Sequence, residues 1–265
     1  MKLFCRKSGN GPPLIILHGL YGSSDNWVTF SKRLENYFTV YLPDIRNHGR
    51  SPHDIVHDYD SMRDDLYELV NDLNTGKIFL AGHSMGGKVA VAFALKWPEL
   101  ISGLLIADVS PFQNGIRQKS TYLQHLTILD AVNSCDLAMI SSRAEADSIL
   151  AQKISSERER GLILKNLHRQ SAGEFEWKLN VAALLSNIGS IMAGVNSGNS
   201  INTPVTGFPV IFLRAGDSDY LPLSDFKDIQ KIFPAAEFIT ITGAGHWIQV
   251  DKPEDVALNI RKLLE

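Results

Sequence analysis

Residues 78–94 constrain the fold of this chain more than any other segment. They run from an apolar stretch of strand length, through a short turn, into a helix of small residues. Gly82 and Gly86 flank Ser84 in that turn, and because they lack β-carbons they allow a strand to reverse directly into a helix. The segment therefore predicts a nucleophile elbow, in which the Ser84 hydroxyl stands above the end of the strand.

Apolar runs of strand length recur along the chain and alternate with helical patterns in its first half. The runs cover residues 14–18, 38–42, 77–82, 101–107, 208–214 and 236–241. Helices are predicted over residues 26–35, 59–73, 85–96, 223–232 and 253–264. Such alternation is typical of an α/β fold, with a mostly parallel sheet and helices on both of its faces.

Residues 111–206 interrupt this alternation. Strand-like runs stop there, and helical periodicity with charged faces takes over. We therefore predict an α/β core made of residues 1–110 and 207–265, with residues 111–206 inserted as a helical cap. The Gly, Asn and Ser run at 193–200 has little to bury and is typical of a mobile connector.

Composition narrows the range of partners. The 265 residues carry a formal net charge of -3, so no electrostatic feature favours nucleic acid or an anionic membrane surface. Cys5 and Cys135 lie far apart without metal-type spacing, which favours neither a disulfide framework nor a zinc site. The chain shows no secretion signal and no apolar run long enough to span a membrane, so we expect a cytoplasmic protein. The oligomeric state does not follow from the sequence.

A serine hydroxyl needs a base to act as a nucleophile near neutral pH. His246 lies in a glycine-rich turn, residues 243–247, directly after the last apolar run. The glycines let this turn curl over the carboxyl edge of the sheet, where open α/β sheets bind ligands. His246 also follows Ser84 in the chain order serine, acid, histidine, so it is the predicted general base.

Acyl transfer also needs two N–H donors for the oxyanion of the tetrahedral intermediate. The residue after the nucleophile supplies one of them, which predicts the amide of Met85. The second is expected after the strand at 14–18, where Gly19 allows the bend that turns the Leu20 amide toward the site. His18, beside this loop, is interpreted as a structural hydrogen-bonding residue.

Two aspartates compete to be the carboxylate that orients His246. Asp108 directly follows the run at 101–107, and Asp219 follows the run at 208–214. Both therefore lie near carboxyl ends of predicted strands, and the sequence alone does not choose between them. Asp217, two residues before Asp219, fits a helix cap or a loop stabiliser.

Two further segments are rich in polar or aromatic side chains. Residues 44–51 form a dense polar turn, which favours a hydrogen-bonded loop that buttresses the elbow over an anion site. In the predicted cap, Phe175 and Trp177 share one face if the chain is extended there, and they fit either a substrate pocket or ordinary packing.

These segments together resemble the α/β-hydrolase superfamily and, within it, the YbfF-like esterases. The resemblance rests on the stretches at residues 18–26, 44–51, 82–88, 177–180 and 243–247. It implies a cofactor-free serine esterase or thioesterase with a helical lid, and it favours Asp108 as the acid. Asp217 and Asp219 depart from the family pattern, which keeps Asp219 as the alternative. We expect Trp177 and Trp247, which stand within these stretches, to contact substrate.

The sequence thus predicts a hydrolase for small-molecule acyl esters or thioesters, acting through an acyl-enzyme on Ser84. No metal and no cofactor is expected. The same fold also hosts enzymes that cleave carbon–carbon bonds, and a member that binds ligand without turnover is a further alternative. The length of the acyl group does not follow from the sequence.

Overall fold

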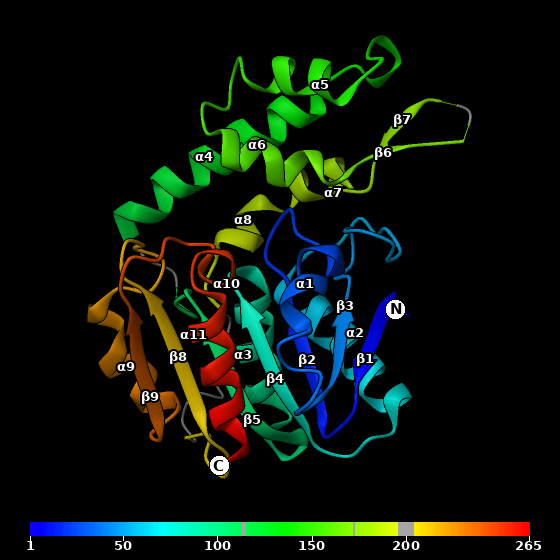
Figure 1. Cartoon of the computed structure of the whole chain (residues 1–265). Coiled ribbons are helices and arrows are strands. Elements are labelled where there is room, and N and C mark those ends of the chain that lie inside the picture. The colour runs from blue at the N-terminus through cyan, green and yellow to red at the C-terminus, as the bar shows by residue number, and fades with distance from the viewer. Residues whose placement is uncertain (113–114, 172, 196–203) are drawn as a thin grey trace.

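The computed structural model describes all residues except 113–114, 172 and 196–203, and describes no side chains for 115–119. A seven-stranded sheet forms its centre, in the order β1-β3-β2-β4-β5-β8-β9 (Figure 1). The strands are β1 (Cys5–Gly9), β2 (Pro13–Leu17), β3 (Thr39–Pro43), β4 (Ile78–His83), β5 (Ile101–Ala107), β8 (Val210–Ala215) and β9 (Ala236–Ile241). Only β1 runs antiparallel to its neighbour, so the sheet is mostly parallel, as predicted.

Helices cover both faces of the sheet. The helices are α1 (Val28–Ser31), α2 (Tyr59–Leu73), α3 (Met85–Lys96), α9 (Phe226–Ile232), α10 (Ile248–Asp251) and α11 (Pro253–Arg261). Apolar side chains of α2, α3 and α9 bury one face, and those of α1, α10 and α11 bury the other. Because β2, β4, β5 and β8 are covered on both sides, almost all of their side chains are buried, which explains their continuous apolar runs.

Two elements of the sheet-bearing part differ from the prediction. The helix expected over 26–35 is only the four-residue α1, preceded by a 3-10 turn at Ser24–Asn26, because the chain needs several tight turns there. Strand β1 was not predicted. It is an antiparallel edge strand whose residues are half-buried or exposed, so its sequence lacks an apolar run.

The chain between β5 and β8 lies over one end of the sheet (Figure 1). It contains α4 (Gly115–Asn133), α5 (Arg143–Leu150), α6 (Glu157–Leu164), α7 (Val181–Ser186) and α8 (Ile188–Met192). It also contains a small antiparallel pair, β6 (Leu167–Arg169) and β7 (Phe175–Trp177), where only helices were expected. The predicted connector at 193–200 falls largely outside the described residues.

Two buried side chains of the sheet-bearing part hold the end of α8. The Tyr59 hydroxyl donates a hydrogen bond of 2.7 Å to the carbonyl of Ile191. The Lys88 ammonium donates one of 2.8 Å to the carbonyl of Ala193, and burial lowers the pKa of Lys88 to about 8. The inserted segment is therefore attached to α2 and α3, directly beside the elbow.

The elbow leaves no room for side chains at its glycines. A β-carbon on Gly86 would lie 2.5 Å from the carbonyl oxygen of His18, and one on Gly82 would collide with the carbonyl of Gly86. These neighbours are backbone atoms, so they cannot rotate away. The close approach of β2, β4 and α3 thus requires glycine at both positions.

We expect Gly86→Ala to lower the free energy of unfolding by about 1–3 kcal/mol, because the added methyl overpacks a backbone contact. Gly161→Ala is the matched control, since α6 has nothing within 4 Å of a β-carbon there. Alanine also favours the helix by up to about 1 kcal/mol, so this variant should be as stable as the wild type or more stable. Urea unfolding measures the stability of both variants, and equal effects would contradict the steric requirement for glycine at position 86.

Candidate active site

Ser84 lies between the end of β4 and the start of α3. Its backbone has φ of 54° and ψ of -123°, a conformation that residues with a β-carbon rarely adopt. The Ser84 amide donates to the carbonyl of Ala107 at 3.1 Å, which ties the turn to the neighbouring strand β5. Strain of this kind costs on the order of 1–3 kcal/mol and persists where surrounding packing enforces it.

His246 lies in the loop between β9 and α10 and contacts Ser84 directly. Its Nε2 atom is 3.0 Å from Ser84 Oγ, and its Nδ1 atom is 2.8 Å from Asp108 Oδ2. An Nδ1–H that donates to the carboxylate leaves Nε2 free to accept the serine proton. The three side chains thus form one continuous chain of hydrogen bonds.

The carboxylate that meets His246 in this chain is Asp108. It is fully buried and follows β5 with φ of 48°. Its Oδ1 accepts the Ala215 amide at 3.0 Å, and its Oδ2 also accepts the Ser218 hydroxyl at 2.5 Å. These donors offset the cost of burying a charge, because hydrogen bonds replace the water that the carboxylate has lost.

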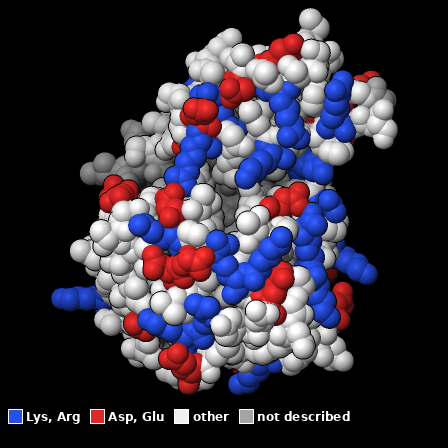
Figure 2. Space-filling view, in the orientation of Figure 1, with Lys and Arg blue, Asp and Glu red and all other residues white. Residues whose placement is uncertain are grey.

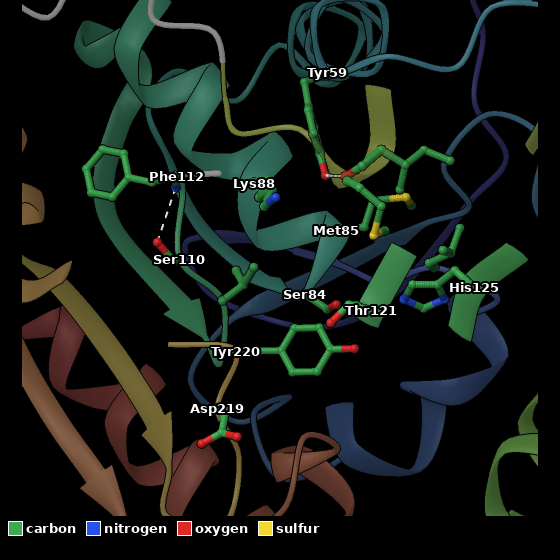
Figure 3. Close-up of a pocket in the computed structure, with 14 residues that line it drawn as sticks. Tyr59, Ser84, Met85, Lys88, Ser110, Phe112, Thr121, His125, Asp219 and Tyr220 are labelled. Carbon is green, nitrogen blue, oxygen red and sulfur yellow. Dashed lines mark hydrogen bonds between the residues drawn. The ribbon is translucent and has the colours of Figure 1, made fainter. Parts of the chain in front are cut away.

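Asp219, the other candidate acid, lies in the loop after β8. It lines a small cavity next to Ser84, and its carboxylate points away from the Ser84 side chain (Figure 3). The residue before it, Ser218, is the one whose hydroxyl reaches Asp108. The geometry thus favours Asp108 as the partner of His246.

The predicted oxyanion donors lie together beside the Ser84 hydroxyl. Leu20 and Met85 both line the same cavity as Ser84. Met85 is the first residue of α3, where helical N–H groups have no partner within the helix. Within the described part of the chain, neither the Leu20 nor the Met85 amide donates to a protein acceptor. The structure thus places Leu20 and Met85 in the lining of one cavity with Ser84, and neither backbone N–H has a protein acceptor among the described residues.

Two cavities have Ser84 in their lining. The smaller one has a volume of about 90 Å³ and reaches past Met85 to Lys88 and Tyr59 (Figure 3). The larger one has a volume of about 500 Å³, and its lining includes His246. In the space-filling view, a hollow separates the inserted helices from the sheet-bearing part, with lysine and arginine on both of its sides (Figure 2).

The structure separates the two tryptophans that were expected to contact substrate. Trp247 lines the larger cavity, and the guanidinium of Arg158 lies 4.6 Å from the centre of its ring. Trp177 lies in β7, where it packs against Phe175 and neighbouring apolar side chains, and it lines neither of the two cavities. The structure therefore brings Trp247 to the site and leaves Trp177 away from it.

The polar loop at residues 44–51 is held by its own hydrogen bonds. The buried Asp44 carboxylate accepts the amides of Ser24 at 2.6 Å and Arg50 at 2.8 Å. Arg46 forms a buried ion pair with Asp65, with a nitrogen–oxygen distance of 2.5 Å. Because the Asp44 carboxylate and the Arg46 guanidinium both have partners within the protein, the loop fits a buttress better than an anion site.

Buried histidines lie beside His246 and beside the polar loop at residues 44–51. Burial lowers the pKa of His83 to about 3, and its ring makes a 2.7 Å hydrogen bond through Nε2 to the carbonyl of His246. Burial also lowers the pKa of His57 to about 3, with a smaller contribution from the positive charge of Arg46. The ring of Tyr220 stacks on the imidazole of His246 at 3.7 Å between centres. His246 is thus held at its backbone, its ring edge and its ring face.

Two features are absent from the described residues. No group of three or more His, Cys, Asp or Glu side chains there is arranged to hold a metal ion. Among the same residues, no helix is both long enough and apolar enough to cross a membrane.

One known fold has this arrangement. In it, a strand turns sharply at a serine into a helix, and a histidine and an aspartate lie next to the turn. The family description of the α/β-hydrolase fold matches residues 12–253, which is most of the chain. The chain belongs to the α/β-hydrolase family. The family match confirms the fold class that was expected from the sequence. Because its relatives are named as esterases and lipases, this α/β hydrolase is an enzyme.

The relatives are named as esterases and lipases. The α/β hydrolase is 34% identical over 260 residues to an sn-1-specific diacylglycerol lipase of Danio rerio, covering 97% of this chain and 80% of the relative. It is 31% identical over 255 residues to the esterase YbfF of Escherichia coli, covering 96% and 94% respectively, which confirms the predicted resemblance. A solved marine microorganism esterase has a TM-score of 0.93 and 39% identity, covering 99% of each chain.

Three side chains of the site were not predicted from the sequence. Ser218 stands beside both aspartates of its loop, but only the folded loop shows that its hydroxyl reaches Asp108. Tyr220, two residues later, contacts His246 through ring stacking across loops that are distant in sequence. His83 directly precedes Ser84, and its position in that turn was the signal by which the sequence could have indicated it.

We expect His57→Gln to make the protein less sensitive to acid. The folded state keeps His57 neutral while the unfolded chain protonates it below about pH 6.5, so its contribution to stability falls as the pH drops. From pH 7 to pH 5, His57 alone should lower the free energy of unfolding by about 2 kcal/mol. Urea unfolding at both pH values should show that the variant loses about 2 kcal/mol less stability than the wild type on going from pH 7 to pH 5. Equal losses in the two proteins would contradict the prediction.

Proposed function

We propose that this chain is a serine esterase that hydrolyses small-molecule acyl esters, including thioesters, through an acyl-enzyme on Ser84. The observation that carries the proposal is the hydrogen-bonded chain from Ser84 Oγ to His246 to Asp108, with distances of 3.0 Å and 2.8 Å. The esterase and lipase relatives support cleavage of an ester bond.

In the first step, His246 Nε2 takes the proton of the Ser84 hydroxyl while Oγ attacks the substrate carbonyl carbon. The amides of Leu20 and Met85 donate to the negatively charged oxygen that forms. Asp108 stabilises the resulting imidazolium and keeps its Nδ1 side oriented. His246 then gives the proton to the leaving oxygen or sulfur, which departs as an alcohol or thiol and leaves the acyl group on Ser84.

In the second step, His246 removes a proton from water, and the hydroxide formed attacks the acyl carbon. The same two amides hold the oxyanion. When the intermediate collapses, the bond to Ser84 Oγ breaks and the proton returns to that oxygen. The products are a carboxylic acid and the restored serine.

The two cavities suggest how an ester is oriented. The leaving group must lie within reach of His246, and His246 lines the cavity of about 500 Å³. The acyl group then enters the cavity of about 90 Å³, between Met85 and the buried Lys88. We infer a short acyl group and a bulky alcohol or thiol.

The site predicts different effects for the two aspartates. Asp108→Asn should lower kcat about 10³- to 10⁴-fold, because the amide no longer stabilises the correct tautomer and charge of His246. Asp219→Asn is the matched control and should lower kcat less than tenfold. Hydrolysis of p-nitrophenyl butyrate measures both, and a large loss confined to Asp219→Asn would overturn the assignment.

Ser84→Ala tests the proposed function itself. This variant should lose ester hydrolysis and should also lose labelling by a fluorophosphonate probe, which the folded wild type accepts at Ser84. Near-normal activity of Ser84→Ala, or a folded wild type that neither hydrolyses esters nor reacts with the probe, would refute the mechanism.

The cavity sizes predict selectivity for the acyl group. With p-nitrophenol as the constant leaving group, kcat/KM should fall at least tenfold from butyrate to decanoate, since the longer chain does not fit the smaller cavity. Enlarging the alcohol of an acetate ester should have little effect. Faster hydrolysis of the decanoate would contradict the proposed orientation.

A further inference from the structure

The loop that carries Leu20 contains a backbone conformation that is unfavourable for its residue. The Gly22 amide donates to the carbonyl of Gly19 at 3.0 Å and closes a four-residue turn. Tyr21 is the third residue of this turn and has φ of 63°. Turns that need positive φ at this position favour glycine or asparagine, because a β-carbon is crowded there. Surrounding contacts must therefore hold Tyr21 in place.

Three hydrogen bonds hold Tyr21, one at each of its polar groups. Its amide donates to His48 Nε2 at 3.3 Å, in the polar loop of the sheet-bearing part. Its carbonyl accepts from Asn166 Nδ2 at 2.8 Å, and its hydroxyl lies 3.0 Å from His125 Nδ1. Asn166 and His125 both belong to the segment inserted between β5 and β8. Two of the three bonds thus come from the inserted segment.

Asn166 is itself held firmly. It follows the last turn of α6, and both Asn166 and Tyr21 are only 4% exposed. The backbone carbonyl of Asn166 accepts a hydrogen bond of 2.9 Å from the backbone amide of Lys178, next to β7. The backbone amide of Asn166 donates one of 2.9 Å to the carbonyl of Ile163. Its side chain therefore has little freedom to turn away from Tyr21. A fixed donor of this kind can hold a strained turn, whereas a mobile one cannot.

The turn matters because Leu20, the residue before Tyr21, supplies a proposed oxyanion donor. The Leu20 N–H belongs to the same peptide group as the Gly19 carbonyl that accepts from Gly22. A rotation of the backbone at Tyr21 would open this turn and so redirect the Leu20 amide. Hydrogen bonds to an oxyanion depend steeply on distance and angle, so a small displacement lowers the rate strongly.

We propose that Asn166 is a positioning residue, which reaches from the inserted segment to hold the Tyr21 turn so that the Leu20 amide faces the oxyanion. The inserted segment thereby completes the oxyanion site as well as covering it. This inference rests on the proposed function. It assigns to α6 and the residues after it a role in the rate of the chemical step, in addition to any role in binding substrate.

The test compares Asn166→Ala with a matched control, Asn187→Ala. The Asn187 side chain also donates from the inserted segment to a backbone carbonyl at 2.8 Å, but its acceptor is Ile55, away from the Leu20 loop. Asn166→Ala should lower kcat about 10- to 100-fold with KM changed less than about threefold. Asn187→Ala should keep kcat within about threefold of the wild type.

A second readout separates positioning from general damage. Phenylboronic acid forms a tetrahedral adduct when Ser84 Oγ adds to boron, and one oxygen of the adduct occupies the oxyanion position. Its affinity should fall in Asn166→Ala by about the same factor as kcat/KM, because both depend on the Leu20 amide. Asn166→Asp, which has the same shape but lacks the N–H donor, should reproduce the loss if the alanine variant does not fold.

The outcomes distinguish the inference from the proposed function. If the wild type hydrolyses esters and the folded Asn166 variants match Asn187→Ala in kcat and in boronate affinity, the inference is wrong and the proposed function stands. A rise in KM at unchanged kcat would also overturn it, since that is the effect of a binding residue. If the folded wild type neither hydrolyses esters nor reacts with a fluorophosphonate, both fail.

Discussion

The reversal of the chain at Ser84 is the constraint on which the site depends. β4 passes into α3 within one residue, and Gly82 and Gly86 allow backbone atoms to approach where side chains would collide. The strained φ of 54° at Ser84 is enforced by the hydrogen bond to Ala107 and by burial of α3 against the sheet. Packing against the sheet thus offsets the backbone strain at Ser84 and keeps its hydroxyl facing the cavities.

The parallel sheet brings the other groups to that hydroxyl. Parallel strands end at the same edge, so the loops after β2, β4, β5, β8 and β9 converge there. Asp108, Ser218 and His246 come from three of these loops and form one hydrogen-bond network. The inserted segment adds contacts from the opposite side, through the Tyr21 turn and the end of α8, so the site lies between two parts of the chain.

Local signals predicted the elements that carry their own pattern. The helix over 59–73, the helix over 85–96 and the strand at 101–107 agree with α2, α3 and β5, because each combines strong periodicity with clear ends. Edge strand β1 lacks an apolar run, and α1 is shortened by neighbouring turns, so neither was predictable. Ser218 and Tyr220 were missed because their contacts join loops that are far apart in sequence.

The sequence by itself determined the fold class, and it predicted the two residues that our proposed mechanism needs most, Ser84 and His246, because glycine patterns mark both turns. The choice between Asp108 and Asp219 belonged to the tertiary structure. Both follow strands, but β5 pairs directly with β4 in a register that sets Ala107 opposite His83, so Asp108 emerges beside the elbow. Only the order and register of strands, which depend on packing across the whole sheet, decide which carboxylate meets the histidine.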